Sequence, residues 1–186
     1  ILFSDIRGFT SLSESRPAEE VVAMLNRYLS MQTERVFHHG GTLDKFIGDA
    51  IMAFWNAPTD DADHAVHAVA CALDMVETLA RFNASNAASG IDLDIGIGLH
   101  TGPAVVGFVG SQRKLEYTAI GDTVNLGSRL EGETKGRTRI LVSAATRDAC
   151  GDAFHFTDFG TVTVKGRQAS VQVFAPAKPG ASAEAA

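Results

Sequence analysis

Two aspartates stand at the ends of apolar segments, Asp5 in "FSDIRGFT" and Asp49 in "DKFIGDAIMAF". If their strands are neighbours in one sheet, the two carboxylates converge and repel each other unless a cation lies between them. A pair of Mg²⁺ or Mn²⁺ ions held by two aspartates and by substrate phosphates is a common arrangement for phosphoryl transfer. The backbone amides of Gly8, Phe9 and Thr10 follow Asp5 directly and are suited to cradle phosphate. We therefore expect a metal-dependent phosphoryl-transfer site at this edge of the sheet.

Each of these charges also has an ordinary structural explanation. Asp5 can cap the turn that follows it, and Asp49, after Gly48, suits a two-residue hairpin turn. Lys45 precedes Asp49 by four residues, but a surface ion pair between them would contribute only about 0–1 kcal/mol. Each aspartate taken singly favours the structural role, whereas the two together favour the metal site.

Three further polar residues lie on segments that do not need them for folding. Asn125 and Arg129 in "TVNLGSRLEG" are spaced i, i+4 and share a helix face beside the apolar pair Leu126 and Leu130. A planar guanidinium there can bind an anionic phosphoryl group, and Lys165 in "TVTVKGR" can bind a polyphosphate as a point charge. Spacing alone favours a solvated helix face for the first two, and a surface lysine is at least as good an interpretation of the third.

The order of elements predicts how these residues are positioned. Hydrophobic periodicity and turn signals predict a strand, a helix with Pro17 in its first turn, a hairpin, a second helix and a strand. Their ranges are residues 1–6, 13–41, 42–47 with 50–55, 63–82 and 91–99. This βαββαβ order is the split βαβ plan of ferredoxin-like folds, in which the first strand neighbours the central hairpin. Asp5 should therefore approach Asp49.

The remaining segments extend this core. "PAVVGFVG" and "LEYTAI" predict a hairpin, "GDTVNLGSRLEGETKG" a helix capped by Asp122, and 144–150 a short helix between further strands. We expect an α+β fold: a ferredoxin-like, palm-like βαββαβ core with additional C-terminal strands and helices and a mostly antiparallel sheet. One domain over 1–175 precedes a Pro/Ala/Gly-rich tail, 176–186, which its composition predicts to be disordered. The apolar stripes predict inward-facing residues at Val22, Leu25, Leu29 and Val36 in the first long helix and Val66, Val69, Leu73 and Val76 in the second.

Composition limits the partners. The net charge of −6 and the lack of a basic patch argue against nucleic-acid binding. No apolar run approaches the roughly 18 residues of a membrane span, so we expect no membrane contact by this domain itself. Cys71 and Cys150 have no partner motif, which favours reduced thiols and a cytoplasmic catalytic domain. The chain opens inside an apolar stretch without Met, so we expect an upstream regulatory domain and leave open a membrane anchor in the parent protein.

Four ordered motifs together resemble the catalytic domain of class III nucleotidyl cyclases. They are "FSDIRGFT", "DKFIGDAIMAF", "GIGLHTG" and "YTAIGDTVNLGSRLE", and the similarity runs from Leu2 to about Phe174. Four motifs in order are far more specific than a lone pattern. The resemblance implies conversion of a nucleoside triphosphate to its 3′,5′-cyclic monophosphate and pyrophosphate, with two divalent cations in each active site of a homodimer.

The resemblance also implies a role for each matching position. These are Asp5, Asp49 and the backbone carbonyl of Ile6 for the metals, Asn125 for the ribose, Arg129 for the transition state, Lys165 for the triphosphate, and Lys45 with Thr118 for the base. In the family one chain gives the metal aspartates and its partner gives the base, ribose and transition-state residues. Lys45 and Asp49 would then serve different sites.

The base-reading pair indicates ATP. Adenine presents an acceptor at N1 and a donor at N6, whereas Lys45 is donor-only and the Thr118 hydroxyl can accept. Guanine reverses this pattern, and guanylyl cyclases of the family typically carry Glu where Lys45 stands. The alternatives are a guanylate cyclase and a non-catalytic nucleotide-binding dimerisation module. The Gly-Gly-Asp/Glu-Glu-Phe turn of diguanylate cyclases is absent from the sequence.

Overall fold

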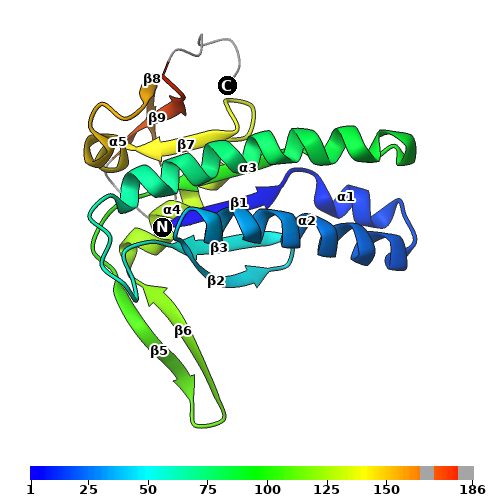
Figure 1. The fold of residues 1–186 in the computed structure, drawn as a ribbon, viewed down its shortest axis with the longest axis horizontal. Coiled ribbons are helices and arrows are strands. Elements are labelled where there is room, and N and C mark those ends of the chain that lie inside the picture. Colours follow the sequence, from blue (N-terminus) through cyan, green and yellow to red (C-terminus); the bar gives the residue numbers. More distant parts are fainter. Residues whose placement is uncertain (164–169, 180–186) are drawn as a thin grey trace.

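The computed structural model describes residues 1–163 and 170–179. Its elements follow one another along the chain as labelled in Figure 1. They are β1 (Leu2–Ile6), α1 (Phe9–Glu14), α2 (Ala18–His38), β2 (Thr42–Ile47), β3 (Ala50–Phe54), α3 (His64–Asn86), a short 3₁₀ turn (Ala87–Ser89), β4 (Ile95–Leu99), β5 (Val105–Ser111), β6 (Lys114–Ile120), α4 (Asp122–Gly132), β7 (Ile140–Ser143), α5 (Ala144–Cys150), β8 (His155–Val162) and β9 (Val171–Ala177).

Seven strands form one sheet in the order β2-β3-β1-β4-β7-β9-β8. Only the β4–β7 pair is parallel among the described strands, and the other neighbours are antiparallel. The first four strands in this order are those of a ferredoxin-like βαββαβ core. The α+β fold and the mostly antiparallel sheet predicted from the sequence are therefore confirmed.

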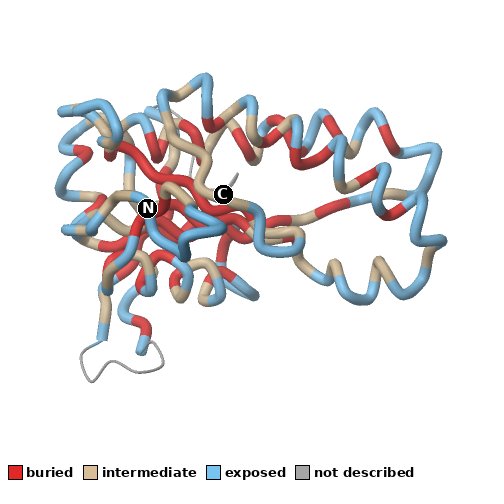
Figure 2. Tube along the Cα trace, turned by 90° about the horizontal axis from the view of Figure 1, so that it is seen from below, coloured by how far each residue is buried: buried red, intermediate tan, exposed pale blue. Residues whose placement is uncertain are grey.

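Helices cover the two faces of the sheet. Figure 1 shows α2 and α3 side by side across one face, where Leu2 and Ile6 of β1 join their apolar residues in the main core. Phe3, which points the other way, packs near Val124 of α4 on the opposite face. In Figure 2 the buried residues (red) follow the central strands, and the exposed residues (pale blue) lie on the outer surfaces.

The helix α4 lies unusually close to the sheet. A Cβ atom on Gly98 of β4 would lie 2.1 Å from the backbone nitrogen of Glu131 and 2.6 Å from the carbonyl oxygen of Gly127. Any side chain at this position would push the helix away, so glycine is required for this approach. The polar face of α4 is thereby held at a fixed place beside β1 and β4.

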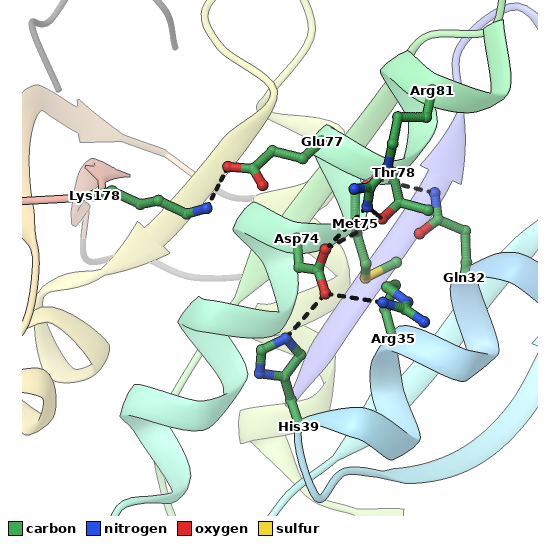
Figure 3. Close-up of polar contacts among 9 residues, drawn as sticks. All are labelled: Gln32, Arg35, His39, Asp74, Met75, Glu77, Thr78, Arg81 and Lys178. Carbon is green, nitrogen blue, oxygen red and sulfur yellow. Dashed lines mark hydrogen bonds and ion pairs between the residues drawn. The ribbon is translucent and has the colours of Figure 1, made fainter.

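A polar cluster joins α2 to α3 on the other face (Figure 3). Asp74 of α3 accepts hydrogen bonds at 3.2 Å from Thr78 and at 3.5 Å from Arg35, and its Oδ2 lies 3.2 Å from Nε2 of His39. The indole of Trp55 also donates to the His39 carbonyl oxygen at 2.8 Å. These contacts fix the end of α2 against α3 and against Trp55, the residue that follows β3.

The structure differs from the sequence expectations at several places. The strand expected over 91–99 begins only at Ile95, and the helix expected over 63–82 continues to Asn86. The single helix expected over 13–41 is two helices, because Pro17 has extended backbone angles (φ −56°, ψ 137°) and stands before α2 as its N-cap. Val22 is 56% exposed, because the buried stripe of α2 runs through Val21, Met24 and Tyr28 and leaves Val22 on the outer face of the helix. Gly121, not Asp122, is the N-cap of α4. β9 extends to Ala177, so residues 176 and 177 pair with β8.

None of the described helices combines the length and the hydropathy that a membrane-crossing helix needs.

Candidate active site

The first site cluster lies where β1 ends beside the β2–β3 hairpin. Antiparallel pairing of β1 with β3 sets Ser4 opposite Ile51, so the next residue, Asp5, arrives next to the turn. Gly48 adopts φ 65° in that turn, a conformation that favours glycine. The backbone N–H of Ile6 then donates to Oδ2 of Asp49 at 3.3 Å. The structure thus brings Asp5, Ile6 and Asp49 together.

The electrostatics of this cluster show that the two carboxyl groups interact. Burial, followed by the charge of Asp49 and a hydrogen bond with it, raises the pKa of Asp5 to about 6, against an opposing hydrogen bond from Ile6. The effect extends to Glu131 of α4, where burial and then the charge of Asp5 raise the pKa to about 7. Ionised carboxylates are therefore destabilised at this position unless positive charge is supplied.

The donor set fits a hard divalent cation. Within residues 1–163 and 170–179, no group of three or more His, Cys, Asp or Glu side chains is arranged to hold a metal. The pair Asp5 and Asp49 accordingly leaves most coordination positions to water or to substrate oxygens, which is how Mg²⁺ is usually bound. Gly8, Phe9 and Thr10 lie at the start of α1, immediately after this pair, with Gly8 at φ 70° as the N-cap.

The second cluster lines a cleft of about 620 Å³ between the β2–β3 hairpin, β6 and α4. Lys45, Thr118 and Asn125 all line it, each from a different element. The fourth expected member, Arg129, is not among the lining residues. Asp5 and Asp49 are not among the lining residues either.

Lys45 and Thr118 have carboxylate partners that the sequence interpretation missed. Nζ of Lys45 lies 2.6 Å from Oε2 of Glu116 and 3.5 Å from Oδ1 of Asp44. The hydroxyl of Thr118 donates to Oδ2 of Asp44 at 2.7 Å. No ion pair joins Lys45 to Asp49 in the described part of the chain, so the local pair considered from the sequence is not what the structure contains.

The polar face of α4 carries Asn125 and Arg129 as expected. Leu126 and Leu130 on the adjoining stripe are buried, which leaves the other two at the margin of the helix. Neither the Asn125 amide nor the Arg129 guanidinium has a hydrogen-bond or ion-pair partner among the described side chains. Lys165 lies outside the described residues.

An apolar surface adjoins the cleft. The β5–β6 arm (Val105–Ile120) forms a separate two-stranded sheet that projects from the body of the molecule (Figure 1). Its exposed apolar side chains include Val105, Phe108 and Leu115, and Phe46 and Ile47 are exposed on the neighbouring hairpin. An isolated hairpin is marginally stable in water, and exposed apolar patches of this kind mark interaction sites.

A second hollow, of about 370 Å³, lies between β3, α3 and the segment after β4. Trp55, His64 and His100 line it, and none of the residues singled out from the sequence does. It is therefore separate from both site clusters.

Comparison with known proteins gives the family. The family model for the adenylate and guanylate cyclase catalytic domain matches residues 1–175. Adenylate cyclase 1 of Rhizobium meliloti is 46% identical over 175 residues, which are 93% of this chain and 26% of that protein. The adenylate cyclase of Anabaena cylindrica is 36% identical over 183 residues, 94% of this chain and 36% of that protein. The chain thus spans only about a quarter to a third of these two relatives.

Solved structures of an adenylyl cyclase and of a guanylyl cyclase are both similar to this fold. The adenylyl cyclase CyaB from P. aeruginosa has a TM-score of 0.89 and 37% identity, with 95% of this chain and 92% of that chain covered. The guanylyl cyclase Cya2 has a TM-score of 0.89 and 41% identity, with 95% and 90% covered. On this evidence the chain belongs to the family of adenylate and guanylate cyclase catalytic domains.

Proposed function

We propose that this domain is an adenylate cyclase that converts ATP to 3′,5′-cyclic AMP and pyrophosphate in intracellular signal transduction. The observation that carries the proposal is the placement of Lys45 and Thr118 in one cleft with Asn125. Lysine offers only donors and matches N1 of adenine, while the threonine oxygen can accept from the 6-amino group.

Fold similarity does not decide between ATP and GTP, because an adenylyl and a guanylyl cyclase both match with a TM-score of 0.89. The residues in the cleft do favour one base. Guanine would set its N1–H donor against the Lys45 ammonium and leave polar groups unpaired in a partly buried site. A site built to hydrogen-bond one substrate group rejects an analogue lacking it by roughly 10⁴-fold in favourable cases.

The polar residues divide the remaining tasks among them. Asp5 and Asp49, with the Ile6 carbonyl, would hold two divalent cations, which when bound lower the pKa of the ribose 3′-hydroxyl and neutralise the phosphates. The Asn125 amide would orient the ribose, and the Arg129 guanidinium would stabilise charge that develops on the α-phosphate oxygens. The N–H groups of Gly8, Phe9 and Thr10 would bind the triphosphate, and Lys165 is proposed to do the same.

We further propose that two copies of the chain form two shared active sites. Within one chain the carboxylate pair is not among the residues that line the cleft, and this supports a site assembled from two chains. The exposed apolar side chains of the β5–β6 arm and of the hairpin lie beside that cleft and suit an interface with a second copy. A symmetric dimer would join each Asp5–Asp49 pair to the partner's cleft, so Lys45 and Asp49 would serve different sites.

The relatives are much longer than this chain. We propose that the domain works within a longer cytoplasmic or membrane-anchored protein in which an upstream region regulates it.

Product analysis tests the proposed function. The protein is incubated with Mg²⁺ or Mn²⁺ and either ATP or GTP, and the products are separated by chromatography. Cyclic AMP as the main product supports the proposal, and cyclic GMP would support the guanylate cyclase alternative. ATP binding without turnover would support a non-catalytic nucleotide-binding module. An Arg129→Ala variant controls for contaminating cyclases.

A further inference from the structure

The strand β2 contains an irregularity next to its base-reading lysine. Leu43 pairs with Ala53 and Lys45 with Met52, so Asp44 is an extra residue in the ladder. In a regular strand, successive side chains point to opposite faces, which would send Asp44 and Lys45 apart. A bulge re-aims a side chain, and here both residues reach β6: Lys45 contacts Glu116, and Asp44 contacts Thr118.

Asp44 is a buried carboxylate whose hydrogen bonds are all accepted by Oδ2, while Oδ1 has only an ion-pair contact. Its side chain is 0% exposed. Oδ2 accepts the Thr118 hydroxyl at 2.7 Å and the backbone N–H of Ala119 at 3.2 Å, and Oδ1 lies 3.5 Å from Nζ of Lys45. Such a carboxylate acts only as an acceptor. The Thr118 hydroxyl must therefore use its single hydrogen on Asp44.

This contact fixes what Thr118 presents to the cleft. A hydroxyl has one hydrogen and two lone pairs, and it normally rotates to suit either a donor or an acceptor. With its hydrogen held by Asp44, the Thr118 oxygen offers only lone pairs to a bound nucleotide. The 6-amino group of adenine can donate to these lone pairs, whereas the O6 carbonyl of guanine is repelled by them.

We infer that Asp44 is a positioning residue for base selectivity, which holds Thr118 as an acceptor and so selects 6-amino over 6-oxo purine nucleotides. The inference rests on the proposed function, since it assigns the base to this cleft. A carboxylate that merely tied β2 to β6 would affect stability and the turnover of both nucleotides alike. A positioning role instead changes the ratio of ATP turnover to GTP turnover.

The test is the ratio of kcat/KM for ATP to that for GTP. In Asp44→Ala the Thr118 hydroxyl is released and can donate to O6, so we expect the ratio to fall roughly tenfold, the value of one hydrogen bond. In Asp44→Asn the amide oxygen can still accept from Thr118 and Ala119, so the ratio should be largely retained.

A double-mutant cycle shows whether Asp44 acts through Thr118. Thr118→Val removes the hydroxyl with little change in shape and should lower the ratio by itself. Adding Asp44→Ala to Thr118→Val should then lower it no further, because nothing remains to be oriented. If the two effects multiply, or if Asp44→Ala leaves the ratio unchanged, the inference is overturned.

Two controls keep the result interpretable. Asp92→Ala removes an exposed carboxylate and should leave the ratio as it is. If Asp44→Ala does not fold, Asp44→Leu keeps the branched shape and the number of side-chain heavy atoms without an acceptor and carries the same expectation. Failure of the proposed function gives a different result from failure of this inference. If the proposed function is wrong, the unmutated protein makes cyclic GMP or no product. If only this inference is wrong, the enzyme is selective for ATP and its ratio of kcat/KM for ATP to kcat/KM for GTP does not depend on Asp44.

Discussion

Asp49 accepts a hydrogen bond from the backbone N–H of Ile6 at 3.3 Å, and this contact holds its carboxylate against that of Asp5. Ile6 and Asp49 are separated by 43 residues in the sequence, and the β1–β3 pairing brings Asp5 and Asp49 together. Their repulsion contributes to the raised pKa of Asp5, which is about 6. The fold thus tolerates an unfavourable arrangement at the place where the proposed chemistry requires cations.

Removing one of these charges should stabilise the metal-free protein. In Asp5→Asn the repulsion with Asp49 is absent, so we expect the Tm in EDTA to rise by a few degrees, since 1 kcal/mol corresponds to about 2–4 °C in a domain of this size. Cyclase activity should fall by roughly 100-fold or more. Added Mn²⁺ should raise the Tm of the unmutated protein and have little effect on the variant. Equal metal-induced shifts in both proteins would contradict the assignment of the metal site.

The stability of the metal-free protein should also depend on Glu131 near neutral pH. Burial, followed by the charge of Asp5, raises the pKa of Glu131 to about 7 from 4.5. A carboxyl whose pKa is raised by folding binds its proton more tightly in the folded state. Its contribution to the free energy of unfolding is therefore complete when the pH is below the pKa of the unfolded state, and it is lost as the pH rises through the pKa of the folded state. Thermal unfolding in EDTA should therefore show a declining Tm over this window.

Glu131→Gln stays uncharged throughout and should flatten that decline. Asp5 also makes the Tm decline as the pH rises, but its pKa in the folded state is about 6. The effect of Glu131 is therefore best measured above that pH. Glu133→Gln, at the C-cap of the same helix and in weak contact with Arg137 at 4.0 Å, is the matched control and should leave the slope unchanged. A Glu131→Gln protein with the same slope as the unmutated one would show that Glu131 is not the titrating group.

Local patterns predicted much of this fold from the sequence. Strand alternation and the glycine turn gave the bounds of β2, and the bounds of α5 were also as expected. The pairing of β1 with the hairpin followed from the βαββαβ order, and it placed Asp5 near Asp49 before any coordinates. Each of these features depends on a period or a turn that is contained in a few neighbouring residues.

Other features of the site were beyond reach of such patterns. Asp44 was overlooked because strand alternation assigns it to the face opposite Lys45, and only the bulge brings it round. Its contact with Thr118 spans 74 residues, and that of Lys45 with Glu116 spans 71. Contacts at such separation depend on where the β5–β6 arm lies against the sheet. Likewise, the sequence pattern did not show which of the adjacent Val21 and Val22 faces the core, and the structure buries Val21 and exposes Val22.

The β5–β6 arm should be required for assembly and activity but not for folding. Phe108 is 74% exposed, so Phe108→Asp should leave the circular dichroism and the Tm nearly unchanged, while a charge in an apolar interface should prevent dimer formation. We expect a monomer by analytical ultracentrifugation and the loss of most activity. Val22→Asp places the same charge on another exposed apolar residue (56% exposed) and should keep the dimer. An active monomeric Phe108→Asp protein would rule out shared sites.

The division of each site between two chains makes a quantitative prediction. Asp5→Ala damages the metal half of a site, and Arg129→Ala damages the transition-state half, so each variant alone should be inactive. In a mixed dimer one site receives the intact aspartates of one chain and the intact arginine of the other, while the second site carries both defects. Random pairing of equal amounts makes about half of the dimers mixed, so roughly a quarter of the unmutated activity should return.

The matched control for this experiment pairs two defects in the same half. Asp5→Ala mixed with Asp49→Ala gives dimers in which every site has a damaged metal half, so no activity should return. Recovery in the first mixture but not in the second can arise only if the carboxylate pair and Arg129 come from different chains. If each site were built within one chain, neither mixture would recover, because each chain would keep its own defect. Native mass spectrometry of the mixtures establishes that chains exchange, so that a failure to recover counts against the shared site itself.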